Sequence, residues 1–457
     1  MSGRVVTMGD TISKLLAEKK YPVLKEVLST MNGADVAAIF NELEPAMLPL
    51  LFRVLPKDIA ADCFVEMEPD AQEQLIKGLS DTELHEIVND LFVDDAADII
   101  EEMPATVVKR ILAQADPQMR REINEVLKYP ENSAGSIMTT EFVSLKPDMT
   151  VRDAFQVIRC TGVDKETVYT CYVTEKGVLV GHVSVKDMIL APSDDIQIRS
   201  LMNENVISIN VHLDQEQVAE MFRKYNFLAM PVVDGENRLV GIITVDDVMD
   251  VMEDEATEDM QIMAAITPSD KTYLRSRPAE LFVHRIPWLL LLMVSATFTG
   301  LIITKFEDAL AVQVVLTAFI PMLMDTGGNS GSQSSVTVIR AISLGELEWS
   351  DLPVVIWKEG RTAFLCGTAL SAACFVKLML IDRLLLGNAG VTVSVALVVC
   401  LTMLFTVILA KIIGCTLPMA AKKLGFDPAV MASPFITTIV DALSLLVYFG
   451  IAKSVLF

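Results

Sequence analysis

Residues 427–452 read DPAVMASPFITTIVDALSLLVYFGIA and place a carboxylate, Asp441, inside an apolar run. About 20 apolar residues suffice to cross a bilayer as a helix. Ser433, Thr437 and Asp441 recur every four residues, so one helical face carries two hydroxyls and an acid. Pro434 should free a backbone carbonyl one turn earlier. An acid at mid-bilayer costs roughly 2.5–3.5 kcal/mol on insertion scales. With no Lys or Arg in the span to neutralise it, Asp441 indicates a cation or proton site; the alternative is a protonated Asp hydrogen-bonded between helices.

Five apolar runs approach the length of a membrane span. The second, residues 310–324 with an apolar continuation to 342, contains an unusual polar stretch, residues 327–333 (GGNSGSQ). Irregular backbone at membrane depth is tolerated where it lines a wet cavity. We therefore expect this stretch to line a pore, where Asn329 and Gln333 add side-chain oxygens. The alternative is a close helix–helix contact, which small residues also permit. The other four runs are 286–304, 362–381, 391–413 and 429–452.

Basic residues in the short loops predict the orientation of these spans. With the N-terminus inside, nine Lys and Arg flank the spans on the cytosolic side and four flank them on the other side. The bias predicts an N-terminal half in the cytosol and, with five spans, a C-terminus outside. The first 20 residues lack the apolar core of a signal peptide, which agrees with this orientation.

Charge is distributed unevenly along the chain. The net charge of −23 lies entirely before Ile286, because the ten acids and ten bases that follow cancel. This division predicts a soluble acidic half joined to a neutral membrane half. A nucleic acid partner is excluded, because the acidic half would repel phosphate. Divalent cations are the natural counter-ions.

The residue types favour Mg²⁺ among these cations. The proposed ligands are hard oxygens without Cys or His, which argues against zinc, copper and nickel. Mg²⁺ keeps several waters while touching one or two carboxylates. One Asp per chain, doubled in a twofold dimer, suits a hydrated ion. Ca²⁺, Mn²⁺ and Co²⁺ remain open on residue chemistry alone.

The acidic half contains a repeated module. Residues 178–189 (VLVGHVSVKDMI) and 238–249 (RLVGIITVDDVM) match at an offset of 60. The sequence of each unit predicts the order strand, helix, strand, turn, strand, helix. The pair resembles tandem cystathionine-β-synthase (CBS) domains. That resemblance implies adenine nucleotide (ATP) binding as a possibility, at the Ser/Thr-x-x-Asp signatures formed by Ser184, Asp187, Thr244 and Asp247.

Residues 10–128 read as short amphipathic helices with internal repeats. Ala60-Ala-Asp62 recurs 36 residues later as Ala96-Ala-Asp98, which predicts a helical superhelix of stacked hairpins. Two acidic clusters stand out: Asp94, Asp95 and Asp98 here, and eight acids between Asp246 and Asp259. Like charges at i, i+3 and i+4 repel one another. A solvated acidic helix is the alternative, but we expect the clusters to need bound cations in order to approach each other.

Nearly the whole chain resembles the MgtE family of Mg²⁺ channels. The resemblance rests on residues 129–138 (YPENSAGSIM), the CBS pair, residues 256–259 (ATED), GGNSGSQ and the stretch from Asp427 to Asp441. It implies a homodimer with a central pore in the lipid bilayer, and long helices that link the CBS domains to it. It also implies that Asp441 is the selectivity carboxylate of the pore. Together with the hydroxyls and the amide noted above, the predicted pore site is Asp441, Thr437, Ser433 and Asn329. Ser433 and Thr437 stand where some relatives carry Asn and Ala, so the side chains around the ion are expected to differ in detail. Asn226 is neutral where a relative can carry an acid. The implied cytosolic Mg²⁺ ligands are Asp62, Asp95, Asp98, Asp214, Glu216, Asp247, Asp250, Glu255, Glu258, Asp259 and Asp427.

The predicted fold is an α-helical five-span membrane domain plus a cytosolic α-helical superhelix and α/β tandem CBS domains. The predicted function is Mg²⁺ uptake into the cytosol through a channel that closes when Mg²⁺ binds between its acidic domains. An ion-coupled carrier and a membrane Mg²⁺ or nucleotide sensor are the alternatives. The sequence argues against an enzyme, because the four histidines are far apart and no nucleophile motif or phosphate loop appears. The predicted divisions are 1–9 disordered, 10–130 superhelix, 131–200 and 201–255 CBS domains, 256–284 connecting (plug) helix, and 285–457 pore domain.

Overall fold

The computed structural model describes residues 9, 11–12, 14–16, 18–269, 273, 276–307, 311 and 313–456. Residues 1–8 of the segment predicted to be disordered lie outside these. The chain forms two compact units, Met1–Val251 and Met252–Phe457, and each is described by itself.

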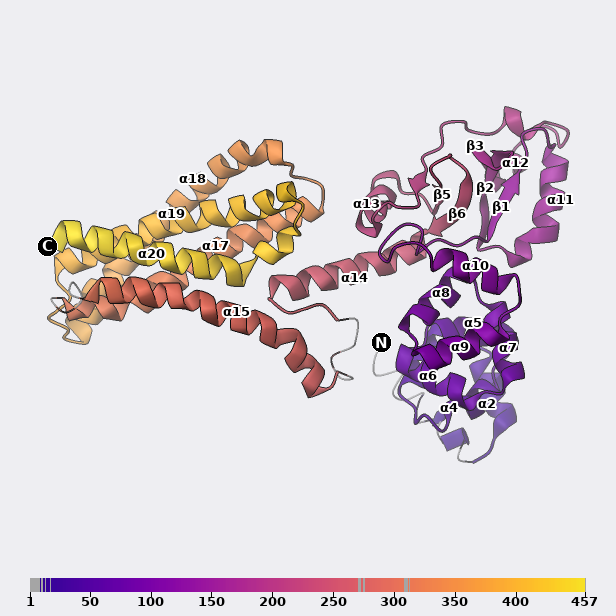
Figure 1. The fold of residues 1–457 in the computed structure, drawn as a ribbon, viewed down its shortest axis with the longest axis horizontal. Helices are drawn as coiled ribbons and strands as arrows, with labels where there is room; N and C mark the ends of the chain where they lie inside the picture. Colours follow the sequence, from indigo (N-terminus) through magenta and orange to yellow (C-terminus); the bar gives the residue numbers. More distant parts are fainter. Residues whose placement is uncertain are drawn as a thin grey trace. The chain divides into compact units, whose positions relative to one another are not determined.

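The first unit begins with a succession of short helices that stack on one another (Figure 1). Packing follows every second helix: α3 on α5, α5 on α7, and α7 on α9. The stack encloses one continuous apolar core. Ser80 caps α7 through a reciprocal bond with Glu83, which satisfies backbone donors at a helix start. The predicted superhelix is therefore present. Its helices are α2 (Tyr21–Leu28), α3 (Gly33–Asn41), α4 (Leu48–Phe52), α5 (Lys57–Val65), α6 (Pro69–Gly78), α7 (Asp81–Asp90), α8 (Val93–Glu102), α9 (Ala105–Gln114) and α10 (Met119–Val126).

Two α/β modules complete the first unit. Each has a three-stranded sheet, in the order β1-β2-β3 and β4-β5-β6, whose first pair is parallel and whose second pair is antiparallel. The predicted order of strand and helix is confirmed in both. The elements are β1 (Phe142–Leu145), α11 (Val151–Thr161), η1 (Gly162–Asp164), β2 (Thr167–Glu175), β3 (Val178–Ser184), α12 (Val185–Ile189), η2 (Ile198–Ser200), β4 (Ile209–Asn210), α13 (Gln215–Tyr225), β5 (Ala229–Val233), β6 (Leu239–Thr244) and α14 (Val245–Met263).

The two modules share a core and exchange backbone hydrogen bonds. Tyr172 and Leu179 of the first pack with Val233 and Ile242 of the second. The Thr139 backbone N–H donates to the carbonyl of Ile242 at 2.8 Å, and that residue's N–H donates back at 2.9 Å. Because these bonds join segments about 100 residues apart, the modules fold as a pair.

The segment after the second module differs from the prediction of one connecting helix over 256–284. Helix α14 begins directly after Thr244 and ends at Met263, and residues 264–269 are not helical. The next helix, α15, begins at Pro278, which occupies a first-turn position where proline loses no hydrogen bond.

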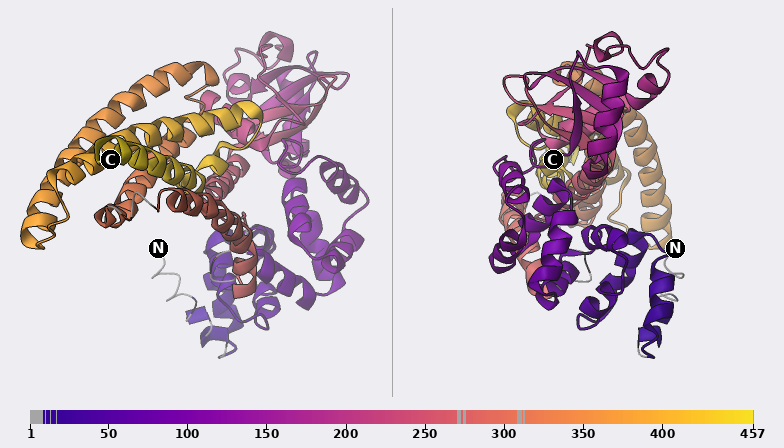
Figure 2. Two further views of the ribbon diagram at one scale, coloured as in Figure 1. Left: turned by 60° about the vertical axis from the view of Figure 1, so that its left-hand side comes forward. Right: turned by 90° about the vertical axis from the view of Figure 1, so that its right-hand side faces the viewer.

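The second unit is a bundle of long helices that run alongside one another (Figures 1 and 2). Helices α17, α19 and α20 pack closely together, α18 packs on α19, and α15 packs on α20. The elements are α15 (Pro278–Lys305), η3 (Val314–Phe319), α17 (Ile320–Ser343), η4 (Trp349–Asp351), α18 (Leu352–Lys377), a π-helical segment η5 (Leu378–Leu385), α19 (Val393–Leu424), η6 (Pro428–Met431) and α20 (Ser433–Leu456).

Among the described residues, four helical segments are long and apolar enough to cross a membrane, by length and composition. They are Pro278–Lys305, Trp349–Leu385, Val393–Leu424 and Pro428–Leu456. Helix α17 has 24 residues but carries Asp325, Arg340 and the GGNSGSQ stretch, which set it apart from these four.

The prediction of irregular backbone at residues 327–333 is wrong, because α17 runs through them as continuous α-helix. Its glycines serve the alternative purpose of close helix packing. A Cβ on Gly331 would lie 2.7 Å from the Ile436 side chain of α20, and one on Gly414 of α19 would lie 2.3 Å from the Gly331 carbonyl oxygen. Small residues therefore let three helices approach at backbone distance.

A charged pair is enclosed in the same bundle. Lys411 of α19 has 7% of its side chain exposed, and its Nζ lies 3.8 Å from Oε2 of Glu359 on α18. The hydroxyl of Ser334 on α17 donates to the same oxygen at 2.7 Å. Charges of opposite sign and a hydrogen bond offset part of the cost of removing these groups from water. This triad links three successive long helices, α17, α18 and α19.

Candidate functional site

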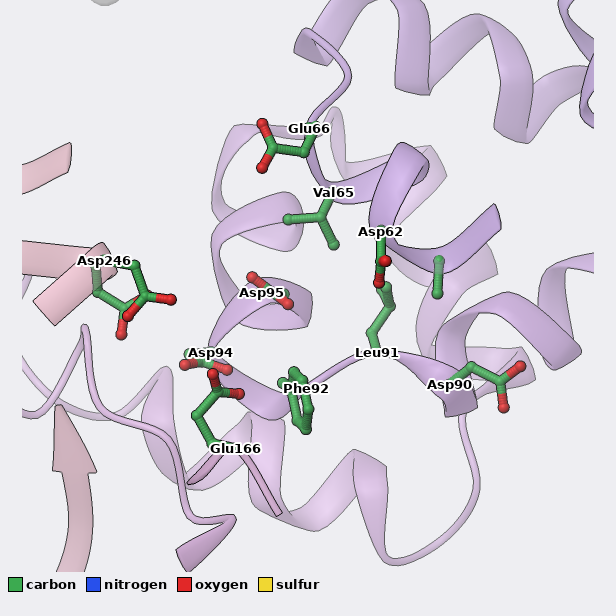
Figure 3. A pocket seen from close by; sticks show the side chains of 12 residues that line it. Asp62, Val65, Glu66, Asp90, Leu91, Phe92, Asp94, Asp95, Glu166 and Asp246 are labelled. Carbon is green, nitrogen blue, oxygen red and sulfur yellow. The ribbon is translucent and has the colours of Figure 1, made fainter. Parts of the chain in front are cut away.

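A cavity of about 260 Å³ in the first unit is lined mainly by carboxylates. Asp62 and Glu66 come from α5 and its end, and Asp94 and Asp95 come from the first turn of α8. The segment just before β2 contributes Glu166, and α14 contributes Asp246 and Asp247. Figure 3 labels all of these acids except Asp247 and shows them around one space, while Asp90 points away from it. The described lining contains no Lys, Arg or His.

Asp94 is the most enclosed of these acids. Only 5% of the residue is exposed, and its Oδ1 atom has no hydrogen-bond partner among the described atoms. Burial raises the pKa of Asp94 well above its ordinary value, and the carboxylates of Asp247 and Asp95 raise it further. A buried oxygen without a donor is unusual and costly. A proton or a metal ion would relieve that cost.

The neighbouring acids are affected in the same direction. Burial, followed by repulsion from Asp247, raises the pKa of Asp95 and that of Glu166 to about 7 each. Burial also raises the pKa of Asp247, while the hydroxyl of Thr244, which donates to its carboxylate, opposes the shift. Near neutral pH the cavity therefore holds several carboxylates that ionise reluctantly because each lies beside the others.

Asp98 lies one turn beyond Asp94 on the exposed side of α8. Loss of hydration and the adjacent Glu101 raise the pKa of Asp98 to about 8. Asp98 is exposed and does not line the cavity, so solvent screens its charge more than that of Asp94. In the described part of the chain, no three His, Cys, Asp or Glu side chains converge closely enough to hold a metal ion directly. The cavity instead has room for an ion that keeps part of its water shell.

A second acidic pair lies in the second unit, at the end of α14. Ser343, the last residue of α17, donates its hydroxyl to Oδ2 of Asp259 at 3.3 Å. Burial and then the nearby Asp427 raise the pKa of Asp259. Asp427 also accepts a hydrogen bond from the Ala429 backbone N–H at 2.7 Å and so caps η6, directly before α20. These two acids therefore connect the end of α14 with the ends of α17 and α20.

Other predicted ligands lie apart from the cavity. Asp214 caps α13 by accepting from the backbone N–H of Glu216 at 3.0 Å, and Asp250, Glu255 and Glu258 lie further along α14. Asn226 ends α13 in the left-handed conformation, at φ 54°. Asn tolerates this conformation well, which gives the neutral residue a structural role.

The two Ser/Thr-x-x-Asp signatures each begin a helix. Ser184 donates to Asp187 at 2.6 Å and accepts from its backbone N–H at 3.0 Å. Thr244 donates to Asp247 in the same way, at 2.5 Å. Asp187 is turned to solvent, whereas Asp247 lines the acidic cavity. The structure thus gives both acids a capping role, and the second acid faces the cavity as well.

In the bundle, Asp325 and Asn329 lie one turn apart on the exposed face of α17. Asp441 of α20 is half-buried and close enough to Asp325 for the two carboxylates to repel. Thr437 packs against Gly328, where an added Cβ would meet its Cγ2 at 2.9 Å. Its hydroxyl donates to the carbonyl of Pro434 at 2.9 Å. The side chain of Ser433 lies outside the described part of the structure.

Sequence profiles and relatives agree with this architecture. The profile described as "Divalent cation transporter" matches residues 320–451, that of the MgtE intracellular N domain matches 31–132, and that of the CBS domain matches 134–194 and 198–254. The "Magnesium transporter MgtE" of Thermus thermophilus is 34% identical over 452 residues, 98% of each chain. That of Bacillus subtilis is 34% identical over 445 residues, 96% of this chain and 95% of its own.

This chain belongs to the MgtE family of magnesium transporters. It is similar to the crystal structure of "the cytosolic domain of the Mg2+ channel MgtE in complex with ATP", with 35% identity and a TM-score of 0.51, over 53% of this chain and 99% of that one. It is also similar to "the soluble part of a magnesium transporter", with 31% identity and a TM-score of 0.51, over 55% of this chain and 99% of that one. The MgtE family comprises membrane transporters, not enzymes.

Within this MgtE chain, sequence reasoning missed four residues of the acidic cavity as candidate ligands. Asp94 and Asp246 belong to the two acidic clusters, but only other acids of these clusters were predicted as ligands. Glu66 recurs 36 residues later as Glu102, at the same offset as Asp62 and Asp98, and this repeat is only a weak signal. Glu166 gave none, because it is a single acid in a segment joined to the cavity only by the fold.

Proposed function

We propose that this MgtE-family protein is a Mg²⁺-selective channel for uptake into the cytosol, and that Mg²⁺ bound by its acidic cytosolic half closes it. The observation that carries the proposal is the cavity around Asp94: acids from four segments, no base among the described lining residues, and a buried carboxylate oxygen without a partner among the described atoms. An ion bound there would replace repulsion between α8 and α14 by attraction. The proposed ligands include Asp62, Asp95 and Asp247, as expected from sequence, together with Asp94.

An inward Mg²⁺ channel needs such a signal. A divalent ion gains about 4.6 kcal/mol per 100 mV of inward-negative potential, twice the value for a single charge. That energy favours accumulation by more than three orders of magnitude. Closure by internal Mg²⁺ prevents this. The conformation that binds more Mg²⁺ is the closed one, so rising Mg²⁺ shifts the population toward it.

The pair Asp259 and Asp427 is the proposed link to the gate. Asp259 contacts the last residue of α17, and Asp427 precedes α20. An ion shared by the two acids would hold the ends of both helices together. When the ion leaves, repulsion between the carboxylates favours separation. The other proposed sensing ligands are Asp98, Asp214, Glu216, Asp250, Glu255 and Glu258.

The proposed pore lies along α17 and α20, with Asp441 as the carboxylate that attracts the hydrated ion. Asn329, Thr437 and Ser433 would contact its water shell. In this proposal α17 is a fifth span, the N-terminal half is cytosolic, the C-terminus is outside, and two copies form the pore. ATP binding at Ser184, Asp187, Thr244 and Asp247 is proposed by likeness to the ATP-bound relative.

Patch recording with stepped internal Mg²⁺ tests the closure mechanism. The double variant Asp95→Asn/Asp247→Asn should keep conducting at internal Mg²⁺ concentrations that close the wild type, because two proposed ligands are lost. Asp70→Asn, at an exposed position in the first turn of α6, is the control and should close normally. Unchanged closure in the double variant would refute the mechanism.

Two other functions predict different results. In an ion-coupled carrier, the reversal potential depends on pH or Na⁺ as well as on the Mg²⁺ gradient; for a channel it should follow Mg²⁺ alone. In a sensor without transport, reconstituted vesicles would take up no Mg²⁺ beyond the background of protein-free vesicles. Broken helices would favour a carrier, but α17 is continuous.

A further inference from the structure

A cavity of about 160 Å³ lies in the second unit, at the C-terminal ends of α17 and α19. Its walls include Ile342, Leu347 and Met419, which belong to or pack on one apolar cluster. Trp349, the first residue of η4, forms another wall. None of the acids proposed to bind Mg²⁺ lines it. The floor therefore suits hydrocarbon, not a hydrated ion.

Two lysines stand at the rim of this cavity. Nζ of Lys423 lies 4.2 Å from the centre of the Trp349 ring. Nζ of Lys422 donates to the carbonyl of Ile342 at 3.4 Å. An ammonium has three donors, so a bond to one carbonyl leaves two for another acceptor. The acid at the rim, Glu348, belongs to the capping box of η4 and accepts a backbone N–H there. The rim thus presents a net positive charge above an apolar floor.

The surroundings of the rim are those of a membrane–water boundary. Leu424 and Phe426 follow the two lysines and are 73% and 64% exposed. Tryptophan beside lysine is typical of the level of lipid headgroups. Basic pockets between membrane helices on the cytoplasmic side hold anionic headgroups.

We propose that this cavity binds an anionic phospholipid, with its phosphate at Lys422 and Lys423 and a segment of acyl chain on the apolar floor. An inorganic anion would gain nothing from the floor, and a neutral lipid would gain little from the lysines. The site rests on the proposed membrane placement of α19 but not on Mg²⁺ permeation. Ile342 precedes Ser343, the residue that donates to Asp259, so the bound lipid would lie beside the proposed gate.

The three tryptophans of the chain provide a direct test. In the full-length variant Trp288→Phe/Trp357→Phe, the remaining tryptophan is Trp349, at the cavity. In Trp288→Phe/Trp349→Phe it is Trp357, which is 67% exposed and lies beside the guanidinium of Arg361 at 5.5 Å. Each variant is reconstituted in phosphatidylcholine vesicles. Quenching by dibrominated phosphatidylglycerol is then compared with quenching by dibrominated phosphatidylcholine.

At Trp349, the anionic lipid should be preferred roughly fivefold for each lysine in contact, and more strongly than at Trp357. In the Trp349 background, Lys422→Gln/Lys423→Gln should reduce the preference to that at Trp357, whereas Lys453→Gln, at the end of α20, should not. Because each result is a ratio within one variant, altered brightness does not affect it. Mg²⁺ uptake measured on the same vesicles shows separately whether the proposed transport holds.

Three outcomes would overturn the proposal. If the preference for anionic lipid were equal at Trp349 and Trp357, only a general attraction of the lipid to a basic surface would remain. This comparison can be made without the lysine variants. Loss of the preference in excess inorganic phosphate would indicate a site for a soluble anion. Retention of the preference after both lysines are replaced would place the headgroup elsewhere.

Discussion

The acidic cavity of the first unit and the charged triad of the second differ in whether their charges are neutralised by neighbouring side chains. Around Asp94, several carboxylates gather without a basic residue among the described lining side chains. Around Lys411, a carboxylate, an ammonium and a hydroxyl are brought together from three helices. The first arrangement is unstable until something binds, whereas the second is complete in itself. A region that must respond to an ion leaves its charge uncompensated, and a region that must hold its shape does not.

The largest expected effect is at Asp441, the carboxylate of the proposed pore. Asp441→Asn should reduce Mg²⁺ uptake by about a hundredfold or more, because a carboxylate near a divalent ion contributes several kcal/mol. Uptake by reconstituted vesicles measures this. Glu346→Gln, in the exposed loop after α17, should leave uptake unchanged. Uptake unaffected by Asp441→Asn would mean that this acid does not serve the ion path.

The pH dependence of stability tests the cavity. The pKa values of Asp95 and Glu166, about 7 in the folded state, exceed ordinary values near 4. Between these values the folded state binds more protons than the unfolded state. Without divalent cations, the first unit should therefore be most stable below about pH 4 and lose several kcal/mol by pH 8. Each of the two carboxylates contributes at most about 3–4 kcal/mol to this loss, and solvent screening reduces that figure. Added Mg²⁺ should restore stability above pH 7.

Scanning calorimetry of the full-length protein can follow this loss. All three tryptophans lie in the second unit, so tryptophan fluorescence reports on that unit alone. A calorimetric transition that is not accompanied by a change in tryptophan fluorescence therefore belongs to the first unit. The temperature of that transition should change with pH and with Mg²⁺. A first-unit transition that is constant from pH 4 to 8 in chelator would contradict the electrostatic account of the cavity.

Breaking the compensated triad should destabilise the bundle. Lys411→Met leaves Glu359 enclosed without its cation, which typically costs about 3 kcal/mol. The tryptophan-detected unfolding transition should shift accordingly. In Lys411→Met/Glu359→Gln no charge remains, and most of the loss should be recovered. If the double variant were as unstable as the single one, packing at Lys411 and not charge would be responsible.

The smallest effect concerns the backbone contact that holds the triad's helices together. Gly414→Ala places a methyl group 2.3 Å from the Gly331 carbonyl oxygen, so the helices must separate, at a cost of about 2 kcal/mol. Gly360→Ala is the control in α18, where a Cβ meets nothing within 4 Å. The same unfolding measurement should show no loss for the control. Equal stability of the two variants would mean that α17 and α19 can shift apart freely.

Local patterns in the sequence predicted most of the fold. The repeat at an offset of 60 gave both CBS modules, since a strand and a helix are each encoded by consecutive residues. The stretch 327–333 failed because composition does not tell whether small residues loosen a helix or let another approach it; the position of Gly414 decides that. Pro434 was misread because α20 begins at Ser433, so the proline lies in the first turn, where it frees no carbonyl.

The candidate sites were less accessible to sequence reasoning. Acids in a cluster can be found by inspection, so Asp95 and Asp247 were predicted. Glu166 reaches the cavity only because β2 pairs with β1 and carries the preceding segment there. Lys411 and Glu359 were counted among the bases and acids of the membrane half, but nothing in their spacing indicates that they meet. Contacts between distant segments require the fold.

The triad also bears on how the chain enters the membrane. An isolated lysine or glutamate inside an apolar helix opposes insertion by roughly 2.5–3.5 kcal/mol. Glu359 on α18 and Lys411 on α19 lie on consecutive long helices. If the two helices form a hairpin that pairs Glu359 with Lys411 before they enter the bilayer, neither charge is exposed to lipid without its partner. We therefore expect residues 352–424 to leave the insertion machinery together. Loss of the pair should impair insertion of the protein into the membrane even if it does not affect transport.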